Sequence, residues 1–133
     1  MNHITIHGSV VGEPELRVTP SGMNVLSFSI MDKHGKDDKQ KTTFHNCIVF
    51  GQLAENTASS IKPRDSVMVS GRLETEEYQK KDGTKGKSTR VICDEVAFSM
   101  RWTSVVADQT DSVLSAVKSK FPNANLLDDE EAF

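Results

Sequence analysis

The sequence lacks the features that mark membrane and exported proteins. No apolar run approaches the roughly 20 residues that a helix needs to cross a bilayer, and the first residues contain neither the charged nor the long apolar part of a secretory signal. Only two cysteines, Cys47 and Cys93, occur in 133 residues, and they form neither a CxxC pair nor a disulfide framework. We therefore expect a protein without a membrane partner that resides in a reducing cytoplasm.

Catalytic and metal-binding patterns are also missing. The four histidines are scattered, and the chain contains no HExxH motif, no cysteine and histidine cluster, and neither GxGxxG nor GxxxxGKS/T. Carboxylates are numerous, but none lies in an apolar run that would raise its pKa for acid–base work. The sequence therefore predicts a protein that is not an enzyme and uses no cofactor or metal.

Charge divides the chain unevenly. Residues 1–107 hold 14 Lys or Arg and 13 Asp or Glu, whereas residues 108–133 hold 2 and 6. We expect one domain over 1–107, followed by a short helical segment over 108–121 that ends before Pro122. Residues 122–133 form the predicted acidic C-terminal tail. In it, four carboxylates precede a terminal ring: Asp128, Asp129, Glu130, Glu131 and Phe133.

The first 107 residues alternate between apolar and polar side chains, which is the period of a half-buried strand. Helical spacing occurs once there, in residues 53–61. A helix between the third and fourth of five strands is the order of the OB-fold, an all-β five-stranded Greek-key barrel. A small β-sandwich remains an alternative. The strands are predicted near 4–18, 25–32, 42–51, 66–78 and 88–100.

The third of these strands has two apolar faces. Phe44 and Phe50 share one face, while Cys47 and Val49 share the other. Two phenylalanines would fill a core well, and a core position is the usual place for them. Cys47 and Val49, however, are small enough for a narrow barrel interior, and this arrangement would turn both phenylalanine rings outward. Strand period alone leaves the two arrangements open.

Tyr78 favours the outward arrangement. It lies in a strongly polar run, where no core position is expected, so an aromatic ring there indicates that something packs on it. Exposed rings with cations between them suit single-stranded nucleic acid, because unpaired bases present flat faces and phosphates need Lys or Arg. The candidate cations are Lys33, Lys41, Arg72, Lys80, Lys85, Lys87 and Arg90.

Several blocks resemble the bacterial single-stranded DNA-binding protein family. They are GSVVGEPELRVTPSGMNVLSFSI near the start, FHNCIVFGQLAENTASSIKPRDSVMVSGRLETEEYQKKDG in the centre, and DEEAF at the end. The resemblance implies an OB-fold that coats single-stranded DNA during replication, recombination and repair, associated with the nucleoid. It places Phe44, Phe50 and Tyr78 where members carry base-stacking rings, the family's known use of this fold.

The same resemblance implies partners beyond DNA. The family usually forms homotetramers, and its acidic tip recruits replication and repair proteins, a role that would fall to residues 128–133 here. Residues 94–106 are similar to the barrel end of actinobacterial members, in which an extra C-terminal strand clamps neighbouring subunits. We therefore expect such a strand after the fifth barrel strand, with Trp102 at an interface or packed on the barrel.

Some positions depart from the family pattern. Asn46, Gln52, Glu74 and Glu76 stand where many members have a basic residue, and Ala132 stands where members typically have proline. Fewer cations predict a shallower dependence of DNA affinity on salt. Two alternatives stay open: an RNA-binding OB module, and a protein-interaction adaptor with reduced DNA affinity.

Overall fold

Five strands and one α-helix form the part of the chain that the computed structural model describes, residues 1–107. The helical segment expected over 108–121 and the acidic tail expected over 122–133 lie outside the described residues. The elements are β1 (Ile4–Val18), β2 (Asn24–His34), β3 (Lys41–Phe50), α1 (Gly51–Ser60), β4 (Ser66–Gln79) and β5 (Lys85–Phe98), with a short 3-10 turn, η1, at Asp37–Lys39.

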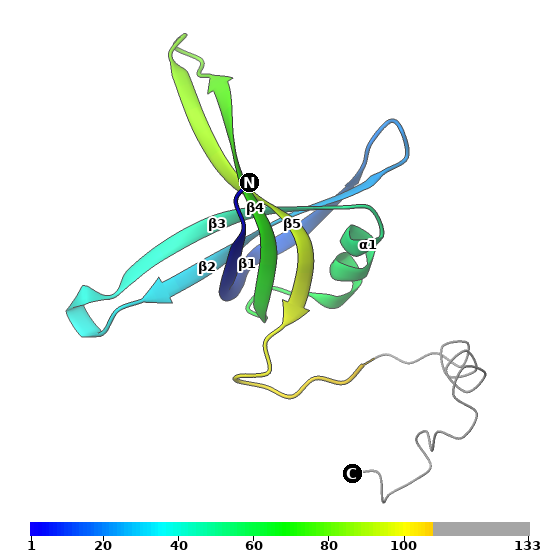
Figure 1. Cartoon of the computed structure of the whole chain (residues 1–133), viewed down its shortest axis with the longest axis vertical. Helices are drawn as coiled ribbons and strands as arrows, with labels where there is room; N and C mark the ends of the chain where they lie inside the picture. The colour runs from blue at the N-terminus through cyan, green and yellow to red at the C-terminus, as the bar shows by residue number, and fades with distance from the viewer. Residues whose placement is uncertain (108–133) are drawn as a thin grey trace, which may run out of the picture. The chain divides into compact units, whose positions relative to one another are not determined.

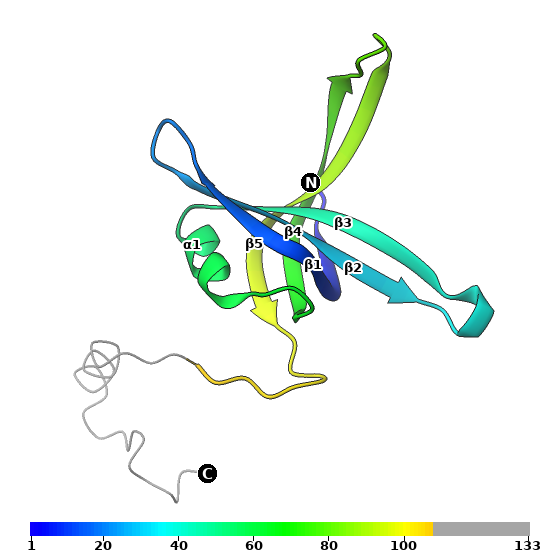
Figure 2. The same cartoon turned by 180° about the vertical axis from the view of Figure 1, so that it is seen from behind.

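The strands close into one barrel in the order β1-β2-β3-β5-β4, as Figures 1 and 2 show from opposite sides. Neighbouring strands run antiparallel, except that β3 and β5 run parallel. With α1 between β3 and β4, this is the OB-fold. The predicted fold class is confirmed, and the β-sandwich alternative is wrong because the sheet closes on itself.

The barrel interior is filled by the side chains that point inward, which are every second residue along each strand. Leu26 and Ile30 of β2, Val49 of β3 and Val91 of β5 are fully buried. Their branched side chains suit a pleated surface that packs on one side only. Alternation along the sequence therefore reports which side chains enter the barrel.

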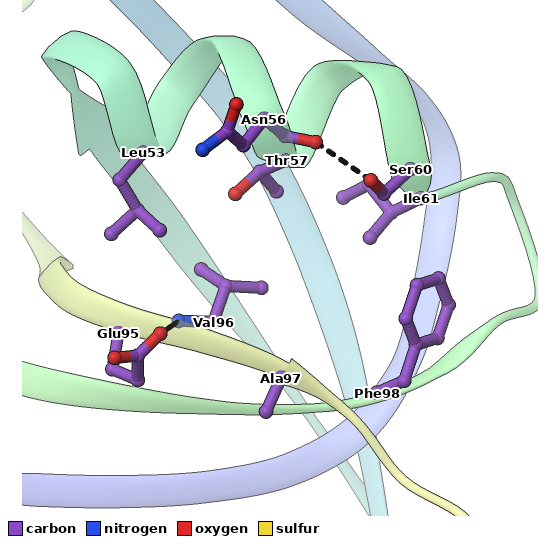
Figure 3. A pocket seen from close by; sticks show the side chains of 9 residues that line it. All are labelled: Leu53, Asn56, Thr57, Ser60, Ile61, Glu95, Val96, Ala97 and Phe98. Carbon is purple, nitrogen blue, oxygen red and sulfur yellow. Dashed lines mark hydrogen bonds between the residues drawn. The ribbon is translucent and has the colours of Figure 1, made fainter. Parts of the chain in front are cut away.

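The helix α1 packs against the barrel through Ala54, which belongs to the same buried cluster. A groove of 280 Å³ remains between α1 and β5. Figure 3 shows Leu53 of the helix and Val96 of the strand facing each other across it, while Phe98 lines its far end. The groove has both apolar and polar lining residues, and none of the rings predicted to bind bases lines it.

The β2–β3 and β4–β5 hairpins project from the barrel (Figure 1). The β4–β5 hairpin turns at residues 80–84, where the Lys80 amide donates to the Thr84 carbonyl and Gly83 adopts a φ of 87°. The β2–β3 hairpin turns around η1. Because both hairpins continue the barrel strands, their side chains keep the register of the barrel surface.

The additional strand expected after the barrel is not formed in the described part of the chain. β5 ends at Phe98, and residues 99–107 follow without regular structure. A strand needs a neighbouring backbone edge to pair with.

Candidate nucleic-acid interface

The strand register places the candidate aromatic rings on one side of the sheet. Asn46 of β3 pairs with Ser29 of β2 on one side and with Arg90 of β5 on the other. Arg90 in turn pairs with Glu74 of β4. Directly paired residues point to the same face, so this row crosses four strands on one outer surface.

We call this surface the aromatic face. Its long side chains come from four strands: Met31 and Lys33 of β2, Phe44, Asn46, Ile48 and Phe50 of β3, Arg90 and Ile92 of β5, and Arg72, Glu74, Glu76 and Tyr78 of β4.

The aromatic rings on this face are open to solvent. Phe44 is 60% exposed, Phe50 is 42% exposed and Tyr78 is 49% exposed, whereas Cys47 and Val49 are buried. The outward orientation of both phenylalanines is thus confirmed. Large exposed rings are costly to leave in water, so their presence on one face indicates a surface that receives a flat or apolar partner.

Tyr78 is held by its cross-strand neighbour. It pairs with Gly86 of β5, and a Cβ built on that glycine would lie 2.6 Å from the tyrosine Cζ. The ring therefore lies against the glycine backbone, which orders it before any partner binds. A ring that is fixed in advance loses less conformational entropy when it stacks.

The candidate cations divide between two faces. Lys33 pairs with Thr42, two residues from Phe44, and so belongs to the aromatic face. Lys41 follows on the opposite face, because successive strand residues alternate. By the same rule Lys85 and Lys87 lie on the face opposite Tyr78, because they flank its partner Gly86. Lys80 lies in the turn that follows β4.

The two arginines of the aromatic face are engaged by carboxylates. Glu74 Oε2 lies 3.6 Å from Arg72 Nη2, and Glu74 Oε1 lies 3.3 Å from Arg90 Nη2. Arg90 Nη2 also forms an ion pair with Glu76. The four charges cancel, so the centre of the face carries no net charge. Sequence reasoning noted both glutamates as departures from a basic pattern but missed this pairing, because only the β4–β5 register brings the side chains together.

A groove of 380 Å³ lies on the same face, beside the stretch of β3 between Phe44 and Phe50. Asn46 lines it and accepts a hydrogen bond from the Ser29 hydroxyl at 3.0 Å. Its wall from β1 carries Glu13 and Glu15, and no Lys or Arg lines it. The groove has both polar and apolar lining residues, and the adjoining segment of β3 carries a ring at each end, Phe44 and Phe50.

Neither a cluster of metal ligands nor a membrane-spanning helix occurs among the described residues. Among residues 1–107 no group of three or more His, Cys, Asp or Glu side chains could hold a metal ion. Across the same range no helix has the length and apolar character to cross a membrane.

A closed five-stranded barrel with exposed aromatic rings on its outer surface is typical of OB-fold proteins that bind a ligand on the barrel surface. Residues 1–99 match the Single-strand binding protein family, and the chain belongs to that family.

Named relatives cover most of the chain. It is 35% identical over 105 residues to the single-stranded DNA-binding protein of Clostridium tetani, a match that covers 77% of this chain and 72% of that protein. It is 34% identical over 114 residues to the single-stranded DNA-binding protein of Paenarthrobacter aurescens, covering 80% and 67%. It is 36% identical over 107 residues to single-stranded DNA-binding protein 3 of Clostridium acetobutylicum, covering 78% and 74%.

Proposed function

We propose that this protein binds single-stranded DNA without sequence preference, by stacking bases on Phe44, Phe50 and Tyr78. The observation that carries the proposal is that these three rings are exposed on one continuous face. Every base has a flat π-face, so stacking tolerates any sequence. Membership of the Single-strand binding protein family and the names of the relatives support DNA as the strand that is bound.

Phosphates are bound by the cations nearest the rings. Lys33 has its side chain on the aromatic face, and Arg72 and Arg90 share that face with Tyr78. The remaining candidates, Lys41, Lys80, Lys85 and Lys87, serve as a second set at the hairpin ends, where long side chains can reach a strand that wraps around the hairpin. The small number of cations on the face itself gives a shallow dependence of affinity on salt.

The wider role is the coating of single strands in DNA replication, recombination and repair, in the cytoplasm. The acidic tip recruits partner proteins, because a pocket that holds the Phe133 ring can clamp Asp128, Asp129, Glu130 and Glu131 with Lys or Arg side chains.

The working particle is a homotetramer in this proposal. Within the described part of the chain, residues 4–8 of β1 pair with β4 along one edge but not with β2 along the other, since pairing with β2 starts at Ser9. An unpaired strand edge favours addition of a strand from a second copy.

Binding is tested with a fluorescently labelled dT oligonucleotide followed by anisotropy. Combining Phe44→Ala with Tyr78→Ala should weaken binding at least about tenfold, since stacking contributes about 1–3 kcal/mol per base. Val18→Ala is the matched control, because Val18 is also an exposed apolar side chain but lies outside the aromatic face. Equal affinity of the double variant and the control would reject the stacking assignment.

The same assay separates the alternatives. Wild-type protein that prefers a matched rU oligonucleotide would be an RNA-binding module, because a reader of the 2′-OH favours RNA. The neutralised arginines favour one further candidate, an adaptor with little DNA affinity. That protein would retain no oligonucleotide but would still capture replication or repair proteins, and removal of Phe133 would abolish the capture.

A further inference from the structure

Arg90 is the cation closest to the centre of the aromatic face, yet its guanidinium is already occupied. One nitrogen, Nη2, contacts carboxylates of both Glu74 and Glu76. The Nε atom is buried and has no hydrogen-bond partner among the described residues. The side chain is 27% exposed, so solvent and a ligand can still reach part of it.

This pairing is not the strongest that an arginine can make. A two-nitrogen, two-oxygen fork gives parallel hydrogen bonds to one carboxylate or phosphate. Here one nitrogen is shared between two carboxylates and Nε is left over. A backbone phosphodiester, with its two non-bridging oxygens, could therefore replace a carboxylate without loss of hydrogen bonds at Arg90.

We propose that Glu74 and Glu76 act as internal competitors for nucleic-acid phosphates at Arg90, and so set the affinity and salt dependence of the aromatic face. The inference rests on the proposed function and names how its site is regulated. The two carboxylates occupy the guanidinium in the free protein and repel an approaching phosphate. Binding at this point requires them to leave, while stacking on the rings does not.

Glu74 extends the effect to a second cation. Its other oxygen faces Arg72, so one carboxylate lies between the two arginines of the face. Strands that bind mainly through bases are weakened least by such carboxylates, and strands that bind mainly through phosphates are weakened most. The arrangement selects for unpaired bases over a bare polyanion.

Glu77 provides a matched control within the same hairpin. It lies next to Glu76 in β4, but it pairs with Lys87 and therefore points to the opposite face. Glu77→Gln removes the same charge, from the same strand, with the same change of shape. Any difference between Glu76→Gln and Glu77→Gln measures position on the face and not net charge.

The experiment measures affinity for a dT oligonucleotide at several salt concentrations. The double variant Glu74→Gln/Glu76→Gln should bind about fivefold to tenfold more tightly than wild type at low salt. The reason is that each exposed ion pair that a phosphate must displace lowers the affinity by up to about fivefold. The slope of log affinity against log salt should steepen by about 0.7 for each additional phosphate that the variant neutralises. Glu77→Gln should change affinity by less than about twofold and leave the slope unchanged.

A second cycle tests whether the effect passes through Arg90. In an Arg90→Gln background, Glu76→Gln should no longer raise affinity beyond the Glu77→Gln control, since the guanidinium that it released is gone. An undiminished gain in that background would overturn the assignment to Arg90. Circular dichroism and thermal unfolding check that each variant folds. If the double variant does not fold, Glu76→Gln alone, which keeps the ion pairs of Glu74, should still bind the oligonucleotide more tightly than wild type.

The outcomes separate this inference from the proposed function. If wild type binds the oligonucleotide and the glutamate variants match Glu77→Gln, the inference fails and the function stands. If wild type does not bind but Glu74→Gln/Glu76→Gln does, the internal competition is supported and the wild-type function is rejected. If neither protein binds at any salt concentration, both fail.

Discussion

The Tyr78 ring occupies the space that a side chain at position 86 would need. The two residues pair across the β4–β5 hairpin, and a Cβ at Gly86 would come within 2.8 Å of the tyrosine Cε2 and Oη atoms. One side of the ring is thereby covered by backbone, while the residue as a whole stays half exposed. The glycine thus fixes the orientation of the ring on the aromatic face.

We expect Gly86→Ala to weaken single-stranded DNA binding by displacing this ring. The loss should be about fivefold and should not exceed that of Tyr78→Ala, because stacking of one base contributes about 1–3 kcal/mol. In the double variant Gly86→Ala/Tyr78→Ala the two losses of affinity should not add, since both substitutions act through the Tyr78 ring. Anisotropy with a dT oligonucleotide measures each loss, and Ser88→Ala, one pair along the same hairpin face, is the control. Additive losses would show that position 86 acts elsewhere.

Lys33 and Lys41 should differ in their contribution to salt dependence. Both belong to the β2–β3 hairpin, but the register assigns Lys33 to the face of Phe44 and Lys41 to the opposite one. Lys33→Gln should reduce the slope of log affinity against log salt by about 0.7, the value for one phosphate contact on a single strand. Lys41→Gln should reduce the slope by less than Lys33→Gln does, because Lys41 starts on the opposite face and reaches only a strand that wraps around the hairpin. Equal effects would mean that the strand contacts both sides of the hairpin.

Much of the fold follows from the sequence because alternation reports burial directly. Ile6 and Ile30 lie at inward positions of strands that alternate cleanly, and a helical pattern in residues 53–61 predicted α1 within two residues of its start. The orientation of Phe44 did not follow from this period, since its strand is apolar on both faces. The β2–β3 register decides it, because Cys47 and Val49 pair with the buried Phe28 and Leu26 and so share their inward face.

The electrostatics of the candidate site depended on information that strand period does not contain. Lys87 and Tyr78 are separated by a turn, and only the register of β4 with β5 shows that they lie on opposite faces. The hydrogen bond of Arg90 with Glu74 joins residues 16 positions apart. The sequence therefore offered Arg72 and Arg90 as candidate cations, whereas in the folded protein Glu74 and Glu76 neutralise both of them.

Leu26 and Leu16 should respond very differently to the same substitution. They pair directly across β1 and β2, but Leu26 is fully buried and Leu16 is 45% exposed. Leu26→Ala should lower the free energy of unfolding by about 2–5 kcal/mol, through lost burial and the cavity left behind. Leu16→Ala should cost less than about 1 kcal/mol. Urea unfolding followed by circular dichroism measures both, and similar costs would contradict the assigned core.

The thiols of Cys47 and Cys93 are both buried, on neighbouring strands β3 and β5. A hydrogen bond with the Cys93 thiol, together with burial, raises the pKa of Cys47. Folding therefore keeps the Cys47 thiol protonated, whereas the unfolded chain ionises above about pH 8.5. The same hydrogen bond lowers the pKa of Cys93, whose thiol is protected by burial. We expect negligible reaction of native protein with a thiol reagent at pH 8, and two reactive thiols after denaturation.

The same shift sets the sign of a pH effect on stability. A pKa raised by folding gives stability that is complete below the unfolded pKa and is lost as pH rises above it. Cys47 therefore contributes a fall in the free energy of unfolding above about pH 8.5, whereas Cys93, whose pKa is lowered by its hydrogen bond with Cys47, contributes a rise below that pH. Denaturant unfolding at each pH measures this fall, and Cys47→Ala should show a smaller one, because lysine and tyrosine titration is common to both proteins. An identical fall in the variant would remove Cys47 as its cause.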